Sequence, residues 1–282
     1  MKTKINTAKL SVFSNTLLII LKFTVGIISG SVSIISEAIH SSMDLIAALI
    51  AFFAVRVSDT PPDARHPYGH GKVENVSGVI EAVLILVAAV LIIIEAVKKI
   101  LGEAQEIESI WIGVLVMFIS AVVNAFVSRR LYKVARQTGS VALEADALHL
   151  KTDVYTSLGV AAGLGLIMLT GVVWLDPLVA ILVALLILRE SYALLKKAFS
   201  PLLDSSWEAG EIEELEKTLS EMEVNYHDLR TRIAGNYRFI DVHIEIPEGE
   251  SVGNAHSYCD RIEDELKRIY ENLTVTIHVE PV

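Results

Sequence analysis

Long apolar blocks fill most of residues 1–200 of the chain. Each block exceeds the length of about 20 residues that a helix needs to cross a lipid bilayer. The pattern therefore predicts six membrane-spanning helices, near residues 8–30, 34–57, 76–101, 110–132, 141–171 and 176–200. The first block is not read as a cleavable signal peptide, because its apolar part is too long and no small-residue cleavage site precedes polar sequence.

From about residue 204 the pattern changes to short amphipathic segments. The stretch "SSWEAGEIEELEKTLSEMEV" is acidic, whereas "RFIDVHIEI" and "LTVTIHVE" alternate apolar and polar residues as half-buried strands do. The predicted elements are helix 208–222, strand 226–234, strand 238–246, helix 253–271 and strand 273–279. We therefore expect a six-helix transmembrane domain, residues 1–203, and then a small cytoplasmic α+β domain, residues 204–282, with its helices on one face of an open sheet.

The composition narrows the class of protein. Of the 282 residues, 52% are hydrophobic, and the mean hydropathy of +0.51 is rare for a soluble domain of this length. The net charge of -10 does not suggest nucleic acid as a partner. Cys259 is the single cysteine, so the chain can form no internal disulfide and no thiolate-based zinc site.

Positive charge is concentrated on one side of the predicted membrane. Lysine and arginine lie before the first block, between the second and third, between the fourth and fifth, and after the sixth. The opposite side has mainly Lys98 and Lys99, next to acidic residues. Because cytoplasmic loops carry an excess of Lys and Arg, both termini and the tail are predicted to face the cytoplasm.

Two of the predicted spans contain a histidine and an aspartate four residues apart. These are His40 and Asp44 in "ISEAIHSSMDLIAALIAFFAV", and His149 and Asp153 in "ALHLKTDVYTSLGV". The spacing puts both side chains of a pair on one helical face. A single such pair could simply bond a neighbouring helix, although an aspartate at the centre of a span costs roughly 2.5–3.5 kcal/mol on insertion scales. Two pairs together supply two imidazoles and two carboxylates, which is the ligand set of a tetrahedral zinc site within the membrane.

The other histidines form two further groups. The proline- and glycine-rich loop "DTPPDARHPYGHGKVEN" contains Asp63, His66 and His70, which could hold a zinc ion with an open or shared fourth position. The tail contains His227, His243, His256 and His278, with Glu280 two residues after His278 on the same strand face. This group indicates a cytoplasmic metal cluster, and solvated surface histidines are the alternative for both groups.

Taken together, these residues resemble a known family, the cation diffusion facilitators. The resemblance covers essentially the whole chain and depends on the six spans, the two H-x-x-x-D pairs, the loop "RHPYGHGKVE" and the tail "HDLRTRIAGNYRFIDVHIEIP". It implies a homodimeric metal-ion/proton antiporter that exports Zn²⁺ or a related divalent cation, with a ferredoxin-like, metallochaperone-like cytoplasmic domain. It implies a transport site of His40, Asp44, His149 and Asp153, a loop site of Asp63, His66 and His70, and a binuclear tail site of His227, His243, His256, His278 and Glu280. In the best-studied bacterial relatives the position of Glu280 is Asp, so the resemblance leaves the bridging geometry there open.

The expected mechanism is competition between zinc and protons at one site. Zinc needs neutral imidazole and ionised carboxylate, so its binding releases protons, and protons from the far side compete for the same groups once the site turns outward. Such antiport needs no ATP, and the sequence contains no P-loop. The tail is expected to sense cytoplasmic zinc and to hold the dimer.

Other functions stay open at this point. A membrane metallohydrolase would need an open zinc site and a general base, but "HSSMD" lacks the H-E-x-x-H signature. A membrane-bound metal sensor that moves nothing would explain the tail group but not the intramembrane quartet. Within the transporter class, Cd²⁺, Fe²⁺, Co²⁺ and Ni²⁺ can use the same ligands. We therefore expect a cation transporter of the cell (inner) membrane, not an enzyme, whose ion is most simply Zn²⁺.

Overall fold

The computed structural model describes residues 2–29, 32–101, 110–170, 172 and 174–282. A few helical side chains inside these ranges, including that of His40, lie outside the described set. The chain divides into two compact units, Met1–Phe199 and Ser200–Val282. Each unit has a hydrophobic core of its own.

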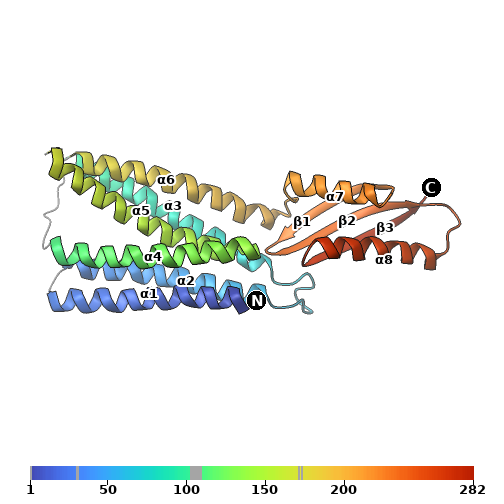
Figure 1. The fold of residues 1–282 in the computed structure, drawn as a ribbon, viewed down its shortest axis with the longest axis horizontal. Helices are drawn as coiled ribbons and strands as arrows, with labels where there is room; N and C mark the ends of the chain where they lie inside the picture. Colours follow the sequence, from blue (N-terminus) through green and yellow to red (C-terminus); the bar gives the residue numbers. More distant parts are fainter. Residues whose placement is uncertain (1, 30–31, 102–109, 171, 173) are drawn as a thin grey trace. The chain divides into compact units, whose positions relative to one another are not determined.

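The first unit consists of long helices that lie along one another (Figure 1). They are α1 (Lys2–Ser29), α2 (Val32–Ser58), α3 (Lys72–Ile100), α4 (Ile110–Thr138), α5 (Val141–Thr170) and α6 (Leu175–Phe199). Each helix overlaps one of the predicted spans, so the predicted helical transmembrane architecture is confirmed.

Among the described residues, 5 helices are long and apolar enough to cross a membrane by length and composition. α5 is not included in this count, which covers only the described residues. The side chains of residues 160–168, in its second half, lie outside the described set. The first half of α5 carries several ionisable residues, namely Glu144, Asp146, Lys151 and Asp153.

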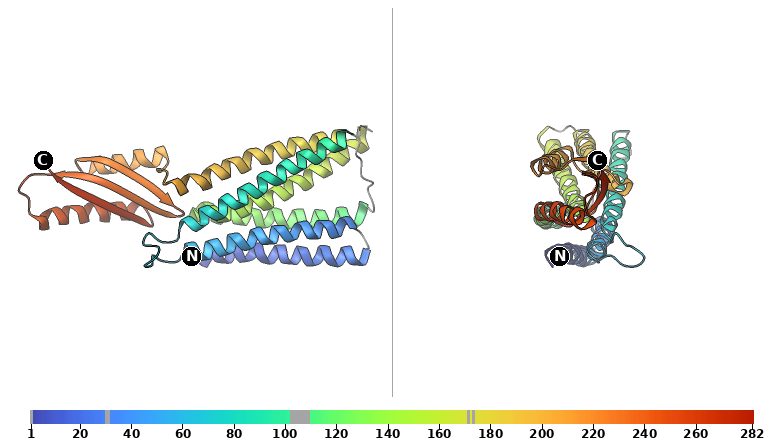
Figure 2. Two further views of the ribbon diagram at one scale, coloured as in Figure 1. Left: turned by 180° about the vertical axis from the view of Figure 1, so that it is seen from behind. Right: turned by 90° about the vertical axis from the view of Figure 1, so that its right-hand side faces the viewer.

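Small buried residues let the helices of the first unit pack closely. Ala8, Ala54 and Ala142 lie in one core that joins α1, α2, α4 and α5. Ala82 and Ala145 lie in a second core, where α5 meets α3 and α6. Since small side chains allow close helix approach in membranes, α5 can contact both groups of helices. α3 and α6 pack along each other (Figure 2).

A buried charge cluster ties together one end of the helices. Lys4 Nζ in α1 lies 2.7 Å from Glu74 Oε1 in α3 and 3.2 Å from Asp59 Oδ1 just after α2. Ser58 Oγ donates a hydrogen bond of 2.8 Å to Glu74 Oε1, and the Ser140 hydroxyl donates to its second oxygen. Glu74 is 0% exposed, so these partners compensate a charge that would otherwise be very costly to bury.

The second unit is a small α+β domain. Its elements are η1 (Ser200–Leu203), α7 (Ala209–Glu221), β1 (Tyr226–Ala234), β2 (Tyr237–Ile246), α8 (Val252–Ile269) and β3 (Leu273–Pro281). This is the predicted order, and the predicted α+β fold class is confirmed. The sheet order is β1-β2-β3, with β1 antiparallel and β3 parallel to β2.

Both helices of this unit cover the same face of the sheet. Leu219 of α7 and Leu266 of α8 are fully buried against Ile240 and Ile244 of β2. Because successive strand residues point to opposite faces, the odd-numbered residues of β2 lie on the uncovered face. His243 is one of these, so the fold leaves this histidine accessible to a ligand.

Candidate metal sites

The structure brings together the two helices that carry the paired histidine and aspartate residues. His149 Nε2 on α5 lies 3.1 Å from Asp44 Oδ1 on α2. Asp153 lies one turn further along α5, and one ligand atom from each of these three residues falls within 4.8 Å of the other two. Asp44 is 6% exposed, so this cluster lies inside the helix bundle. Its imidazole and two carboxylates are ligands that zinc accepts.

The fourth predicted member of this site is only partly described. His40 belongs to α2, one helical turn before Asp44, but its side chain lies outside the described residues. The next residue, Ser41, accepts a hydrogen bond of 2.6 Å from Lys22 Nζ. Because α2 is helical through both residues, the four-residue spacing puts His40 on the same helical face as Asp44, as the sequence predicts.

Asn124 on α4 forms a hydrogen bond with one of the predicted ligands of this site. Its side-chain amide donates a hydrogen bond of 3.2 Å to Asp153 Oδ2. Such a bond orients a carboxylate, and carboxylates that bind metal ions are typically held by hydrogen bonds of this kind. The sequence indicates that a polar residue in this span would bond between helices, but only the structure identifies Asp153 as its partner.

Two buried acids near His149 were not recognised as part of the site from the sequence. Glu81 on α3 and Asp146 on α5 are both 0% exposed. Asp146 precedes His149 by three residues, which puts the two on one helical face. Ser77 Oγ donates to Glu81 Oε1 at 3.3 Å. From the sequence, Glu81 could be interfacial or could line a pathway, and its complete burial excludes an exposed interfacial position. In the sequence, Asp146 could have been recognised from its position three residues before His149.

The loop between α2 and α3 gathers its predicted ligands. Asp63 Oδ1 lies 3.3 Å from His66 Nδ1, and Asp63 Oδ2 lies 3.6 Å from His70 Nε2. The three residues form a group whose ligand atoms lie within 4.8 Å. The backbone N–H groups of His66 and Arg65 donate to Asp63 and hold the pKa of its carboxyl below the ordinary value. This keeps Asp63 ionised, as a metal ligand requires.

The turn geometry of this loop depends on a glycine. Gly69 has a φ of +83°, which glycine adopts without the steric cost that other residues meet. Its N–H donates to the His66 carbonyl at 2.9 Å and closes the turn. The rings of His66 and His70 thereby come within 4.5 Å, centroid to centroid.

The uncovered face of the sheet carries a row of histidines. His227 of β1 pairs in register with His243 of β2, which in turn pairs with His278 of β3. Glu280 joins the row, with its carboxylate 3.1 Å from His243 Nδ1 and 3.3 Å from His227 Nε2. His227, His243 and Glu280 form a third group with ligand atoms within 4.8 Å. The strand register therefore assembles a site that no single segment contains.

His256 lies apart from this group. It is on α8, with its side chain 76% exposed and its Nδ1 atom 3.7 Å from Asp260 Oδ1. It lines the same cavity, of about 530 Å³, as Glu280. Glu245 was missed from sequence, yet its Oε1 atom lies 3.4 Å from His227 Nδ1. The signal for Glu245 was its position two residues after His243, on the same strand face.

Two family models match the chain. The model described as the cation efflux transmembrane domain matches residues 8–203, and the one described as the cation efflux protein cytoplasmic domain matches residues 208–282. An uncharacterised transporter of Synechocystis is 34% identical over 258 residues, which cover 90% of this chain and 83% of that protein. The cation-efflux pump FieF of Shewanella oneidensis is 30% identical over 277 residues, which cover 98% of this chain and 93% of that pump.

Proposed function

The chain belongs to the cation efflux family, the cation diffusion facilitators, and on that premise we propose that it exports Zn²⁺ from the cytoplasm in exchange for protons. Efflux of divalent cations across the cell membrane follows from the family, as does a transporter rather than an enzyme. The finer proposal is supported by one observation above all. Asp44, His149 and Asp153, from two different helices, offer ligand atoms within 4.8 Å of one another inside the membrane unit.

The transport site in this proposal consists of His40, Asp44, His149 and Asp153. Two imidazoles and two carboxylates fill the four positions of a tetrahedral zinc ion. The absence of thiolate ligands in this set suits a borderline ion such as Zn²⁺, and the same set could also accept Cd²⁺, Fe²⁺, Co²⁺ or Ni²⁺. A flux measurement that compares these ions therefore decides which of them is the substrate.

Proton exchange follows from the chemistry of the same four side chains. Imidazole must be neutral and carboxylate ionised to bind zinc, so protons and the metal ion compete for the site. When the metal has left, a proton on His149 Nε2 can be held by a hydrogen bond to Asp44 Oδ1, which lies 3.1 Å away. Return of the protonated site to the cytoplasmic side would complete one cycle of antiport.

The second unit is proposed to face the cytoplasm, together with both termini, to hold a homodimer and to sense zinc. His227, His243 and Glu280 would hold one ion together with His278, which pairs in register with His243. His256, which lines a cavity together with Glu280, would contribute to a second ion. Four nitrogen and oxygen donors from three strands fit a zinc site. Binding at cytoplasmic zinc concentrations would then stabilise the arrangement that transports.

The loop site of Asp63, His66 and His70 is proposed to bind a third zinc ion. Its three ligands are mostly exposed and lie on a turn outside the helices, so the fourth position is open to water or another side chain. This exposure favours exchange with the cytoplasm over tight storage.

The proposal is tested by metal flux in proteoliposomes under an imposed pH gradient. The flux through purified wild-type protein is measured for Zn²⁺, Cd²⁺, Fe²⁺, Co²⁺ and Ni²⁺. The same fluxes are measured for Asp153→Asn. We expect zinc to be moved fastest, the flux to fall when the pH gradient is collapsed, and Asp153→Asn to abolish it. Glu95→Gln is the matched control, because Glu95 is an exposed acid on α3.

Several outcomes would overturn parts of this proposal. Faster flux of another ion would replace zinc as the substrate, and flux indifferent to the pH gradient would exclude proton antiport. Bound zinc without any flux in wild-type protein would favour a membrane-bound sensor.

A further inference from the structure

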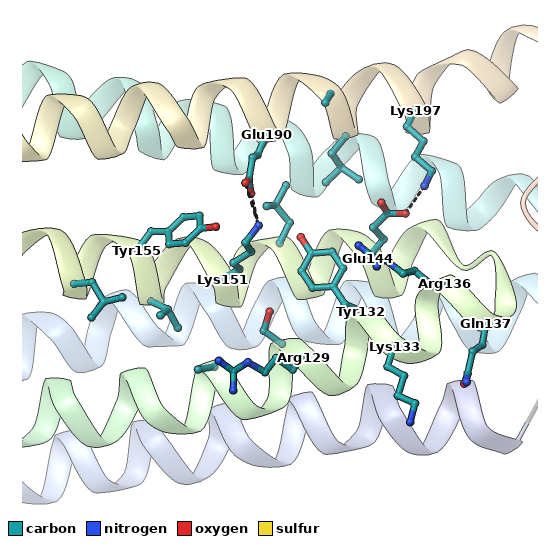
Figure 3. A pocket seen from close by; sticks show the side chains of 17 residues that line it. Arg129, Tyr132, Lys133, Arg136, Gln137, Glu144, Lys151, Tyr155, Glu190 and Lys197 are labelled. Carbon is teal, nitrogen blue, oxygen red and sulfur yellow. Dashed lines mark hydrogen bonds and ion pairs between the residues drawn. The ribbon is translucent and has the colours of Figure 1, made fainter. Parts of the chain in front are cut away.

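A cavity of about 990 Å³ lies between α4, α5 and α6 of the membrane unit (Figure 3). Asp44, His149 and Asp153 are not among the residues that line it. Tyr132 and Tyr155 line it instead, and Lys151 Nζ lies 5.7 and 5.1 Å from the centres of their rings. Tyrosine is enriched where membrane helices meet water, so these two side chains favour a cavity that opens near the lipid headgroups.

The cavity carries an excess of positive charge. Two of its lysines are neutralised, since Lys151 Nζ lies 2.9 Å from Glu190 and Lys197 Nζ lies 2.7 Å from Glu144, as the dashed lines in Figure 3 show. The remaining cations are Arg129, Lys133 and Arg136 of α4, which form no ion pair with any residue that the structure describes. All three are exposed. The lining therefore holds three uncompensated positive charges.

The lining changes from charged to apolar along the helices. Arg136 and Glu144 lie on either side of the short turn between α4 and α5, at one end of the cavity. Leu158 lines the other end and is 60% exposed. At a rise of 1.5 Å per residue, Leu158 lies about 20 Å from Glu144 along α5, which exceeds half the thickness of the hydrocarbon layer. The cavity thus runs from the membrane surface into the apolar layer.

We propose that this cavity binds an anionic phospholipid, with the headgroup phosphate against Arg129 and Arg136 and an acyl chain against Leu158. Arginine matches phosphate through paired N–H donors, and basic pockets between membrane helices bind anionic headgroups. The leaflet concerned is the cytoplasmic one, which rests on the proposed orientation of the chain. The site itself depends only on the cavity and its charges.

Two other occupants fit the lining less well. A divalent cation on its way to the transport site would be repelled by three uncompensated positive charges. A soluble anion such as inorganic phosphate would use the arginines but would leave the apolar end around Leu158 unexplained. A phospholipid matches both ends of the cavity.

The proposal is tested by native mass spectrometry of the full chain released from phosphatidylcholine vesicles with and without phosphatidylglycerol. We expect retained phosphatidylglycerol to exceed phosphatidylcholine, and Arg129→Gln/Arg136→Gln to weaken that retention about thirtyfold. The matched control is Arg130→Gln/Lys196→Gln, which removes the same charge from exposed residues outside the cavity. The control is expected to retain the lipid as wild type does.

Three results would overturn the proposal. The first is an equal loss of phosphatidylglycerol in both double variants, which would indicate an effect of general surface charge. The second is phosphatidylglycerol retention that survives Arg129→Gln/Arg136→Gln. The third is displacement of phosphatidylglycerol by inorganic phosphate, which would indicate a site for a soluble anion. Zinc flux in phosphatidylcholine vesicles is measured on the same samples. Intact flux shows that the variant is folded, and lost flux in wild type would contradict the proposed function and leave the lipid result standing by itself.

Discussion

His149 Nε2 lies 3.1 Å from Asp44 Oδ1, although 105 residues separate the two along the chain. The contact joins α2 to α5, and each of these helices carries a histidine and an aspartate on one face. Each helix supplies only two of the four predicted ligands, so the relative placement of the two helices determines whether these four can hold a metal ion.

Replacing Asn124 should weaken zinc binding without abolishing transport. Its amide donates a hydrogen bond of 3.2 Å to Asp153 Oδ2, so Asn124→Ala removes one of the interactions that orient this carboxylate. We expect the zinc concentration for half-maximal flux to rise about 10–100-fold, with flux at saturating zinc largely kept.

Ser128→Ala is the control for that change. Ser128 lies one turn further along α4 and donates to the Ala147 carbonyl at 2.7 Å, so it also links α4 to α5 but does not contact a ligand. Unaltered zinc affinity is expected. If both variants weaken zinc binding equally, loss of helix contact rather than ligand orientation is the cause.

The histidine row on the sheet should control zinc activation. His243 is central, because it pairs in register with both His227 and His278. In His243→Ala/His278→Ala we expect the zinc concentration for half-maximal activation to rise at least about tenfold, because even residues that only hydrogen-bond to metal ligands change metal affinity by this factor. The preference among metal ions should be kept. The measurement is flux against cytoplasmic-side zinc for each ion of the panel.

His256→Ala gives the comparison within the same unit. Because His256 lies apart from the row, with Asp260 as its neighbour at 3.7 Å, the shift should be smaller than in the double variant. Unchanged zinc dependence in His243→Ala/His278→Ala would exclude the row as the sensor.

Lys4 should be needed for the stability of the helix bundle. It is the cation that compensates Glu74, which is fully buried, so Lys4→Met leaves a buried charge unpaired and should destabilise the fold by about 3–5 kcal/mol. The measurement is the midpoint of thermal unfolding in detergent. Lys9→Met, at an exposed position of α1, is the control and should leave the midpoint unchanged. Partial recovery is expected in Lys4→Met/Glu74→Gln, and an equal loss in that variant would contradict the charge argument.

Cys259 should react slowly with alkylating reagents at neutral pH. Burial raises the pKa of its thiol, and the carboxylate of Asp260 raises it further. A raised pKa lowers the thiolate fraction, so the rate with iodoacetamide should keep rising above about pH 8.5, where an ordinary thiol is half ionised. Asp260→Asn should speed the reaction at neutral pH. Because the chain has one cysteine, mass spectrometry reports this site alone, and a profile that levels off below pH 8.5 would disprove the prediction.

Much of the secondary structure could be predicted from periodicity. The strand predicted at 226–234 is β1 (Tyr226–Ala234), and the helix predicted at 253–271 is α8 (Val252–Ile269). The end of α4 was predicted too early, near residue 132, but the helix continues to Thr138. The prediction ended the helix where the unbroken apolar run gives way to Arg129, Arg130 and Lys133, but Leu131, Val134 and Ala135 keep a buried apolar face beyond that point and the helix continues with it.

The sequence by itself determined the helical spans, the paired spacing of His149 with Asp153, and the alternation that places His243 on one strand face. These properties depend on 3.6 residues per helical turn and 2 per strand repeat, which neighbouring residues set locally. The tertiary structure alone decided that α2 meets α5, that Glu81 is buried next to that meeting point, and that three strands align their histidines. It also decided that one cavity is lined by three cations without an ion pair among the described residues. Contacts of this kind depend on how side chains of distant segments pack and on strand register, and no local period contains that information.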